Sequence, residues 1–132
     1  MGLRILVVED DFTCRRVMCH IVEAFGECDV AVDGEEAVEA VRLGLEGATP
    51  YDVIFLDIMM PKMDGQAALK AIRALELQYE CQPGAGAKIF ITSALDDSKN
   101  VLEAFQSQCD GYIVKPYDKQ KIVTELDARG LI

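Results

Sequence analysis

Residues 53–65 of the chain read VIFLDIMMPKMDG. Four consecutive apolar residues, Val53 to Leu56, are followed directly by a carboxylate, Asp57. A continuous apolar run of this length is typical of a strand that is buried on both faces of a parallel sheet. Asp64 and Gly65 then indicate the beginning of a helix. The stretch therefore predicts a buried strand that places one acidic side chain at the edge of a sheet, followed by a loop and a helix.

Four other apolar runs share this character. They are continuous rather than alternating in polarity and rich in Val and Ile, so each is expected to be a strand buried on both faces. The four runs are Ile5–Val8, Val30–Val32, Ile89–Ile91 and Tyr112–Val114.

A segment of helical period follows each apolar run. The second of these helices is expected to begin at Asp33, which can cap it, while Glu36 reaches back over the first turn. The third, fourth and fifth are expected to begin near Asp64, Asp96 and Asp118. The first helix should face the sheet with Cys14, Val17, Met18, Ile21 and Phe25, and the fourth with Val101, Leu102 and Phe105.

Strand and helix thus alternate five times along the chain. This order predicts an α/β fold, a doubly wound five-stranded parallel sheet with five helices and right-handed crossovers. The length of 132 residues fits one domain spanning residues 1–132. About half of the residues are apolar, which is enough to build a core without disulfides or a structural metal.

The charge and the cysteines narrow the classes of function. The net charge of −10 argues against nucleic acid or an anionic membrane as a partner, because binding to either depends on basic patches. The five cysteines are odd in number and lack C-x-x-C spacing, so neither a complete disulfide set nor a zinc site is predicted. With no signal-peptide pattern and no apolar run of membrane-spanning length, we expect a soluble cytoplasmic domain.

Polar side chains follow four of the five expected strands. In an open α/β sheet, ligands bind beyond the carboxyl ends of the strands, so these side chains are candidates for one site. They are the acids Glu9, Asp10 and Asp11 after the first strand, Asp57 after the third, Thr92 and Ser93 after the fourth, and Lys115 after the fifth.

Several carboxylates at one edge of the sheet require a cation. Two carboxylates about 4 Å apart repel one another by roughly 4 kcal/mol at an effective dielectric constant near 20. Oxygen ligands with space for water suit Mg²⁺, whereas no His or Cys lies at these positions to favour a softer metal. Glu9, Asp10 and Asp11 alone would more simply be a solvated turn that caps the first helix. Asp57 is harder to explain in that way, because its neighbours are apolar.

A lysine and a hydroxyl beside a metal-bound carboxylate indicate phosphoryl transfer to that carboxylate. Metal and lysine would neutralise the charge on the transferring group, and the hydroxyl would bond one of its oxygens. The nucleophile is an ionised carboxylate, so no general base is required. The single histidine, His20, lies in the middle of a predicted helix and is expected to be a surface residue.

Four short motifs, in this order and at this spacing, resemble the signatures of bacterial response-regulator receiver domains. The resemblance covers residues 4–126, and the combination is specific although each motif alone is weak. The motifs are Val7-Val8-Glu9-Asp10, the stretch Asp57 to Gly65, Ser93-Ala94, and Tyr112-Ile113-Val114-Lys115-Pro116.

The resemblance implies a flavodoxin-like fold with strand order 2-1-3-4-5 and a role for each residue of the site. Asp57 would be the phosphoacceptor, and Lys115 would contact the phosphoryl group across a cis bond to Pro116. Mg²⁺ would be held by Asp10, Asp57 and the Met59 carbonyl, with Glu9 acting through water.

Two residues of the resemblance are expected to take part in switching. Ser93 and Thr92 compete for the role of switch hydroxyl, and Ser93 is favoured because it lies 22 residues before Lys115. Tyr112 occupies the position of the switch aromatic, although an ordinary half-buried tyrosine is an equal alternative.

The resemblance also implies partners. A sensor histidine kinase or a phosphotransfer protein would donate the phosphoryl group from a phosphohistidine. Phosphorylation would then change the surface of the fourth helix, fifth strand and fifth helix, and so its affinity for a downstream protein. The domain is expected to be a monomer or a weak dimer, and a single-domain regulator or a piece of a longer one.

Met59 and Leu95 predict slow self-dephosphorylation. Each lies two residues past a key residue of the site, Asp57 or Ser93, where hydrolytic water would approach. Both are apolar, so they can exclude water but cannot orient it. The domain is therefore expected to catalyse only its own phosphorylation and slow dephosphorylation, and not to be an enzyme in the wider sense.

Three alternatives fit the sequence less well. A non-phosphorylated interaction module would not need all of Glu9, Asp10, Asp57, Ser93 and Lys115. A flavodoxin would need a Ser/Thr- and Gly-rich phosphate loop where this chain has three acids. An aspartyl-phosphate hydrolase commonly carries a second carboxylate two residues past its nucleophile, and here that residue is Met59.

Overall fold

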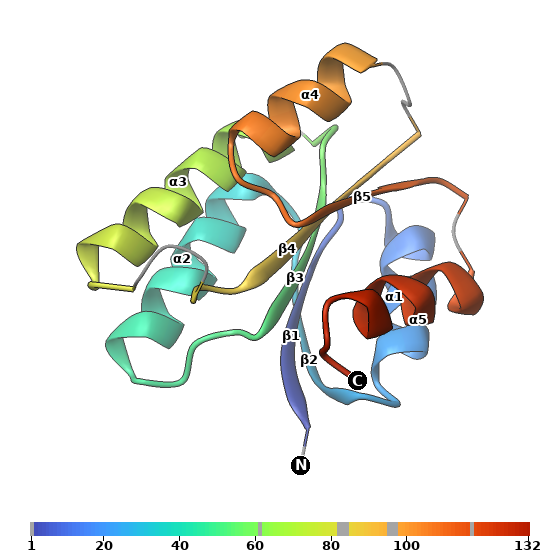
Figure 1. The fold of residues 1–132 in the computed structure, drawn as a ribbon, viewed down its shortest axis with the longest axis horizontal. Coiled ribbons are helices and arrows are strands. Elements are labelled where there is room, and N and C mark those ends of the chain that lie inside the picture. Colours follow the sequence, from blue (N-terminus) through green and yellow to red (C-terminus); the bar gives the residue numbers. More distant parts are fainter. Residues whose placement is uncertain (1, 61, 82–84, 95–97, 117) are drawn as a thin grey trace.

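The computed structural model describes residues 2–60, 62–81, 85–94, 98–116 and 118–132. Within them, strands and helices alternate along the whole chain and form a central sheet covered by helices on both faces (Figure 1). The five strands are β1 (Leu3–Val8), β2 (Gly26–Ala31), β3 (Val53–Asp57), β4 (Lys88–Ser93) and β5 (Gly111–Val114). The five helices are α1 (Phe12–Val22), α2 (Gly34–Glu46), α3 (Gly65–Gln78), α4 (Ser98–Gln106) and α5 (Lys119–Ala128).

All strand pairs are parallel, and the order across the sheet is β2-β1-β3-β4-β5. The expected fold and strand order are confirmed. Helices α1 and α5 cover one face of the sheet, and α2, α3 and α4 cover the other (Figure 1). This arrangement brings the carboxyl ends of β1, β3, β4 and β5 to one edge of the molecule.

The central strand β3 shows why a continuous apolar run is needed. Ile54 and Leu56 pack into the core on the α2–α3–α4 face, whereas Val53 and Phe55 pack into the core on the α1–α5 face. Successive side chains of a strand point to opposite faces, so a strand covered on both sides has no position for a polar residue. The run ends at Asp57, where the strand reaches the edge of both helical layers.

The expectation for the second strand was wrong in extent and in burial. The strand begins at Gly26 rather than Val30 and ends before Val32. It lies at the edge of the sheet, where Val30 is 51% exposed. An edge strand is only partly covered and tolerates the polar residues Glu27 and Asp29, which hide it from a search for apolar runs.

Among the described residues, aspartates cap four helices. The carboxylate of Asp33 accepts a hydrogen bond from the Glu36 N–H at 2.9 Å, and Glu36 bonds back to the Val32 N–H at 3.0 Å. The expected cap at Asp33 and the reach of Glu36 are therefore confirmed. The other three caps are Asp11, Asp64 and Asp118.

Two helix faces differ from the prediction. In α1 the buried row is Met18, Ile21 and Val22, whereas Val17 is 44% exposed. In α4 it is Ala104 that is buried, and Leu102 and Phe105 are 59% and 46% exposed. Their apolar side chains face solvent because α4 lies at the outer edge of its layer (Figure 1). The expected start of α4 at Asp96 falls outside the described residues.

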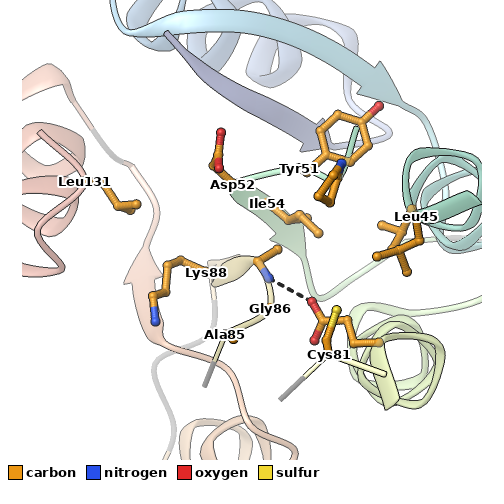
Figure 2. A pocket seen from close by; sticks show the side chains of 13 residues that line it. Leu45, Tyr51, Asp52, Ile54, Cys81, Ala85, Gly86, Lys88 and Leu131 are labelled. Carbon is orange, nitrogen blue, oxygen red and sulfur yellow. Dashed lines mark hydrogen bonds between the residues drawn. The ribbon is translucent and has the colours of Figure 1, made fainter. Parts of the chain in front are cut away.

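A partly buried ion-pair group lies at the amino-terminal edge of the sheet, opposite the candidate site. Arg73 bonds the carboxylates of Glu76 and Asp110 at 2.7 and 2.8 Å, and the Ala87 N–H donates to Glu76 at 2.8 Å. A pocket of about 220 Å³ lies beside this group, lined by Tyr51, Asp52 and Lys88 among others (Figure 2).

Among the described residues, no helix is both long and apolar enough to cross a membrane.

Candidate phosphoacceptor and metal site

The register of the sheet brings the candidate residues together. Val8 is paired with Leu56, so Glu9 and Asp57 follow on adjacent strands. Asp57 is paired with Thr92, and Ser93 with Val114, so Lys115 lies beyond the same edge. Residues from four strands that are up to 106 positions apart in sequence therefore meet at one place.

Three carboxylates form the acidic group of the site: Glu9, Asp10 and Asp57. One oxygen from each lies within 4.8 Å of the others. Glu9 and Asp57 are 2% and 4% exposed, whereas Asp10 is exposed to solvent. Asp11, the fourth acid of the sequence prediction, instead caps α1 by accepting a hydrogen bond from the Thr13 N–H at 2.9 Å. Two buried acids and one exposed acid therefore form a group of oxygen ligands that a cation can approach from solvent.

Lys115 supplies the positive charge that balances the buried acids. Its Nζ lies 2.7 Å from Glu9 Oε1 and 3.5 Å from Asp57 Oδ2. Burial alone would lower the pKa of the Lys115 ammonium, but the hydrogen bond to Glu9 and the charges of Asp57 and Glu9 outweigh it and raise the pKa. The ammonium is therefore protonated, and it is bonded to Glu9 rather than to the candidate nucleophile, Asp57.

The environment of Asp57 disfavours its charge when no metal is bound. Burial, together with a hydrogen bond shared with Glu9 and the charge of Glu9, raises the pKa of Asp57 to about 7. Lys115 and the Met59 N–H, which lies 3.3 Å from Asp57 Oδ1, act in the opposite direction. A carboxylate held in this way gains more from a bound cation than an exposed one does.

The backbone after Asp57 is fixed from two sides. The Ile58 N–H donates to the Thr92 carbonyl at 3.1 Å, and the Gly65 N–H donates to the Ile58 carbonyl at 2.9 Å. A Cβ on Gly65 would lie 2.4 Å from the Asp57 carbonyl oxygen, so only glycine permits this close approach. The glycine that begins α3 therefore positions the strand end that carries Asp57, the candidate nucleophile.

Sequence reasoning missed Arg15. Its guanidinium donates to the Glu9 carbonyl at 2.9 Å from one turn into α1, and the Asp11 N–H donates to Glu9 Oε2 at 3.2 Å. Together these bonds hold the backbone and the side chain of Glu9. An acid followed six residues later by an arginine is not a recognisable sequence motif. The contact depends on how α1 is placed relative to the end of β1.

The hydroxyl and aromatic candidates lie where the sequence placed them, but their roles stay predictions. Ser93 and Thr92 are both buried at the end of β4, and the Ser93 carbonyl accepts a hydrogen bond from the Lys115 N–H at 2.7 Å. Tyr112 is partly buried against the core of the α2–α3–α4 face. The expected cis bond between Lys115 and Pro116 is confirmed.

Two further expectations have different outcomes. His20 is a surface residue, as expected, with its side chain 86% exposed and 3.5 Å from Glu23. The Met59 side chain is 62% exposed beside the site. Leu95, its expected partner in excluding water, falls outside the described residues.

The donor set fits a magnesium ion. All three side chains of the acidic group offer oxygen, two of them from buried positions, and the exposed side leaves room for water and for phosphate oxygens. Burial and the neighbouring Glu9 raise the pKa of Asp57, so a bound cation would stabilise its ionised form. The geometry is therefore that of a nucleophilic carboxylate in a hard-cation site with an adjacent lysine.

Comparison with known proteins is consistent with this geometry. The chain is 32% identical over 129 residues to the regulatory protein VanRB of Enterococcus faecalis, covering 97% of this chain and 52% of VanRB. It is 34% identical over 125 residues to the chemotaxis protein CheY of Treponema pallidum, covering 93% of this chain and 79% of that protein. The chain thus spans about half of VanRB, and it spans 10% of the yeast osmosensing histidine protein kinase SLN1, to which it is 32% identical.

Solved structures agree in fold. A chain in the CheX–CheY–BeF₃–Mg²⁺ complex from Borrelia burgdorferi matches with a TM-score of 0.83 at 27% identity, covering 98% of this chain and 90% of that one. The receiver domain of the histidine kinase CKI1 from Arabidopsis thaliana, complexed with Mg²⁺ and BeF₃⁻, matches with a TM-score of 0.79 at 30% identity, covering 98% and 89%. The family described as response regulator receiver domain matches residues 5–127. This chain therefore belongs to the response regulator receiver domain family.

Proposed function

We propose that this receiver domain accepts a phosphoryl group on Asp57, in a reaction that requires Mg²⁺. The observation that carries the proposal is the placement of buried Asp57 in one group with Glu9, Asp10 and Lys115. The Mg²⁺ and BeF₃⁻ in the solved complexes of CKI1 and of CheY with CheX support it, because these proteins share the fold and the family.

The chemistry is the transfer of a phosphoryl group from nitrogen to oxygen. An oxygen of the Asp57 carboxylate attacks the phosphorus of a phosphohistidine, the P–N bond breaks, and the imidazole leaves with the bonding electrons. The product is an acyl phosphate on Asp57. Asp57 must be ionised to act as the nucleophile. Burial and Glu9 oppose that form, whereas Lys115 and the Met59 N–H favour it.

Asp10, Asp57 and the Met59 carbonyl would hold Mg²⁺, with Glu9 acting through water. When bound, Mg²⁺ neutralises charge on the carboxylates and on the oxygens of the transferring group. Lys115, whose Nζ lies 3.5 Å from Asp57 Oδ2, would contact the phosphoryl group on Asp57. Arg15 and the Asp11 N–H keep Glu9 in place throughout.

Ser93 and Tyr112 are proposed to convert phosphorylation into a change of surface. The phosphoryl group would draw in the Ser93 hydroxyl, and Tyr112 would turn inward as the loop after β4 rearranges. The surface of α4, β5 and α5 already exposes the apolar side chains of Leu102 and Phe105. It also contains a cavity of about 360 Å³ lined by residues of β5 and α5. A downstream protein is proposed to bind there.

The proposed setting is that of a cytoplasmic signalling domain spanning residues 1–132, a monomer or weak dimer, with a sensor histidine kinase or phosphotransfer protein as donor. Its matched relatives come from bacteria, yeast and plants, so membership of the family does not restrict it to bacteria. Exposed Met59 beside Asp57 supports slow self-dephosphorylation, because an apolar side chain there cannot orient a water molecule.

Incubation with Mg²⁺ and acetyl phosphate tests the proposal. We expect the intact mass to increase by one phosphoryl group, and the increase to be absent when Mg²⁺ is chelated. Asp57→Asn should gain nothing, while Asp127→Asn, on the exposed face of α5, should behave like the parent. Equal phosphorylation of the parent and Asp57→Asn would contradict the proposal.

A further inference from the structure

Two of the five cysteines lie in contact although they belong to different elements of the fold. Cys19 belongs to the second half of α1, and Cys28 belongs to the edge strand β2. The Sγ of Cys28 lies 3.3 Å from the Sγ of Cys19. All five cysteines are free thiols. Nothing in the phosphoryl-transfer chemistry above uses this pair.

The surroundings of the pair fix the positions of the two sulfur atoms but leave both side chains partly accessible to solvent. Both side chains pack against the edge of the α1–α5 core, yet both are only partly buried. The backbone on each side is fixed, because the Glu23 N–H donates to the Cys19 carbonyl at 3.0 Å and Cys28 is paired with Ile5 of β1. Small reagents can therefore reach a pair whose geometry is already set.

We infer that Cys19 and Cys28 form a reversible disulfide that ties α1 to β2 under oxidising conditions. The sulfur atoms need to approach by little more than 1 Å to reach the bonded separation of about 2 Å. The segment they enclose runs from residue 19 to residue 28 and includes the whole turn between α1 and β2. Cys14, Cys81 and Cys109 are not part of this contact.

The oxidant is a low-molecular-weight disulfide such as glutathione disulfide. The Cys19 thiolate attacks one sulfur of the reagent, the reagent's S–S bond breaks, and one reagent thiolate leaves. Cys28 then loses its proton and attacks the Cys19 sulfur of the mixed disulfide, which releases the second reagent thiol. Two protein thiols are oxidised to one disulfide, and one reagent disulfide is reduced to two thiols.

Cys19 is the more suitable first nucleophile. Burial, together with the hydrogen bond and charge of Cys19 and the charges of Asp29 and Glu23, raises the pKa of the Cys28 thiol. Both exchange steps need a thiolate. The raised pKa hinders attack on a dilute external reagent more than resolution of the mixed disulfide, where the Cys19 sulfur already lies beside Cys28, so Cys28 is better suited to the second step. In this order the reagent is bonded to Cys19 of α1 in the mixed disulfide, and not to Cys28 of β2.

The disulfide would act on stability rather than on the phosphorylation site. Cys28 is paired with Ile5, four residues before Glu9, so the bond lies toward the amino-terminal half of the sheet. Closing a loop of this size removes conformational freedom from the unfolded chain, and we expect the midpoint of thermal unfolding to rise by about 5 °C or more. Phosphorylation of Asp57 with acetyl phosphate should change by less than about twofold, since no residue of the site is touched.

The test begins with incubation of the full chain in glutathione redox buffers, followed by alkylation of the remaining thiols. Cleavage after glutamate separates the two cysteines, because Glu23 and Glu27 lie between them. We expect the fragments with Cys19 and Cys28 to be recovered as one linked species, and three alkylated cysteines to remain. A reductant should restore all five thiols and return the unfolding midpoint to its original value.

Two serine variants and one control complete the test. Cys19→Ser and Cys28→Ser should each lose the linked species and the rise in the midpoint, whereas Cys81→Ser should keep both. Stable mixed disulfides on Cys19 and Cys28 in the parent, or linkage that survives in either serine variant, would overturn the inference. So would a linked species whose unfolding midpoint equals that of the reduced chain.

Discussion

The ammonium of Lys115 is bonded to Glu9 at 2.7 Å, closer than to the proposed nucleophile Asp57 at 3.5 Å. The lysine therefore neutralises the metal-free site through Glu9. Bound Mg²⁺ and the ammonium would both be stabilised by these carboxylates and would repel one another. Lys115 is therefore expected to weaken Mg²⁺ binding but to assist phosphoryl transfer. Replacing Lys115 should change these two properties in opposite directions.

Lys115→Met should bind Mg²⁺ about tenfold more tightly than the parent, because removing one positive charge a few ångströms from the ion lowers the repulsion it meets. The same variant should be phosphorylated at least tenfold more slowly, because the charge of the transferring group is less well stabilised. Calorimetric titration with Mg²⁺ and the rate of mass increase with acetyl phosphate measure the two effects. Lys70→Met, whose side chain is 60% exposed on α3, is the matched control. Weaker Mg²⁺ binding in Lys115→Met would contradict the assignment.

Stability without Mg²⁺ should depend on the charge of Asp57. The pKa of Asp57 in the folded chain is raised from 3.8 to about 7, so between these values the folded state binds more protons than the unfolded state. The free energy of unfolding therefore falls as the pH rises from about 4 to about 7. Asp57→Asn removes this dependence, and at pH 8 with chelator it should be more stable than the parent by on the order of 2–4 kcal/mol.

Denaturant unfolding of the parent and Asp57→Asn at acidic and alkaline pH, with chelator, measures this difference. The two proteins should have similar stability near pH 4. Addition of Mg²⁺ at pH 8 should stabilise the parent and leave Asp57→Asn nearly unchanged. Asp127→Asn should follow the parent at each pH. If the advantage of Asp57→Asn is the same at both pH values, the cause is not the charge of Asp57.

Gly65→Ala should damage both stability and chemistry. The new Cβ would lie 2.4 Å from the Asp57 carbonyl oxygen and 2.6 Å from Ile58 Cα, so the strand end or the start of α3 must move. We expect a loss of about 1–3 kcal/mol in the free energy of unfolding and slower phosphorylation, since Asp57 is displaced. Gly47→Ala meets its nearest atom at 3.3 Å and should be far milder in unfolding and phosphorylation assays. Normal phosphorylation of Gly65→Ala would show that the position of Asp57 does not depend on this contact.

Ser93→Ala and Thr92→Val distinguish the two hydroxyl candidates. Both side chains are buried at the end of β4, beside Asp57 and Lys115. If Ser93 is the switch hydroxyl, Ser93→Ala should still accept phosphate but lose the change around Tyr112 that follows phosphorylation. Thr92→Val should keep that change. Two-dimensional NMR spectra of the unphosphorylated and phosphorylated proteins provide the measurement, and the opposite pattern would transfer the role to Thr92.

Met59→Asn with Leu95→Glu should speed the loss of the phosphoryl group about tenfold or more, because polar side chains can orient the attacking water. Met59 is 62% exposed beside Asp57, so the first substitution leaves the core intact. The decay of phosphorylated protein after removal of the donor gives the rate. An unchanged lifetime would show that water access at these two positions does not limit hydrolysis.

The sequence predicted the features that depend on short-range patterns. The runs around Ile54 and Ile91 are buried on both faces and therefore stand out, and each ends where a polar side chain of the site begins. Once the order of the strands is assumed, the meeting of Asp57, Ser93 and Lys115 follows from the parallel register. The sequence is therefore enough to propose these three residues as members of one site, but not Arg15.

Other features depend on position in the fold and could not be read from short patterns. The strand β2 alternates irregularly because it lies at the edge, so its beginning at Gly26 was missed. Leu102 and Phe105 were expected to face the sheet, but both are exposed. A helical period shows that one face of a helix is apolar, but it does not show whether another element covers that face. The bonds from Arg15 to the Glu9 carbonyl and from Lys115 to Glu9 join parts of the chain whose geometry only the folded structure defines.

Locating the phosphoryl group tests the central claim most directly. Borohydride reduces an acyl phosphate and converts the phosphorylated aspartate to homoserine, which peptide mass spectrometry can place. Trypsin should release residues 43–62 as one peptide containing Asp52 and Asp57. We predict that, after treatment with acetyl phosphate and Mg²⁺, Asp57 alone is converted. Conversion at Asp10 or Asp52, or a phosphorylated protein with no converted aspartate, would contradict the account.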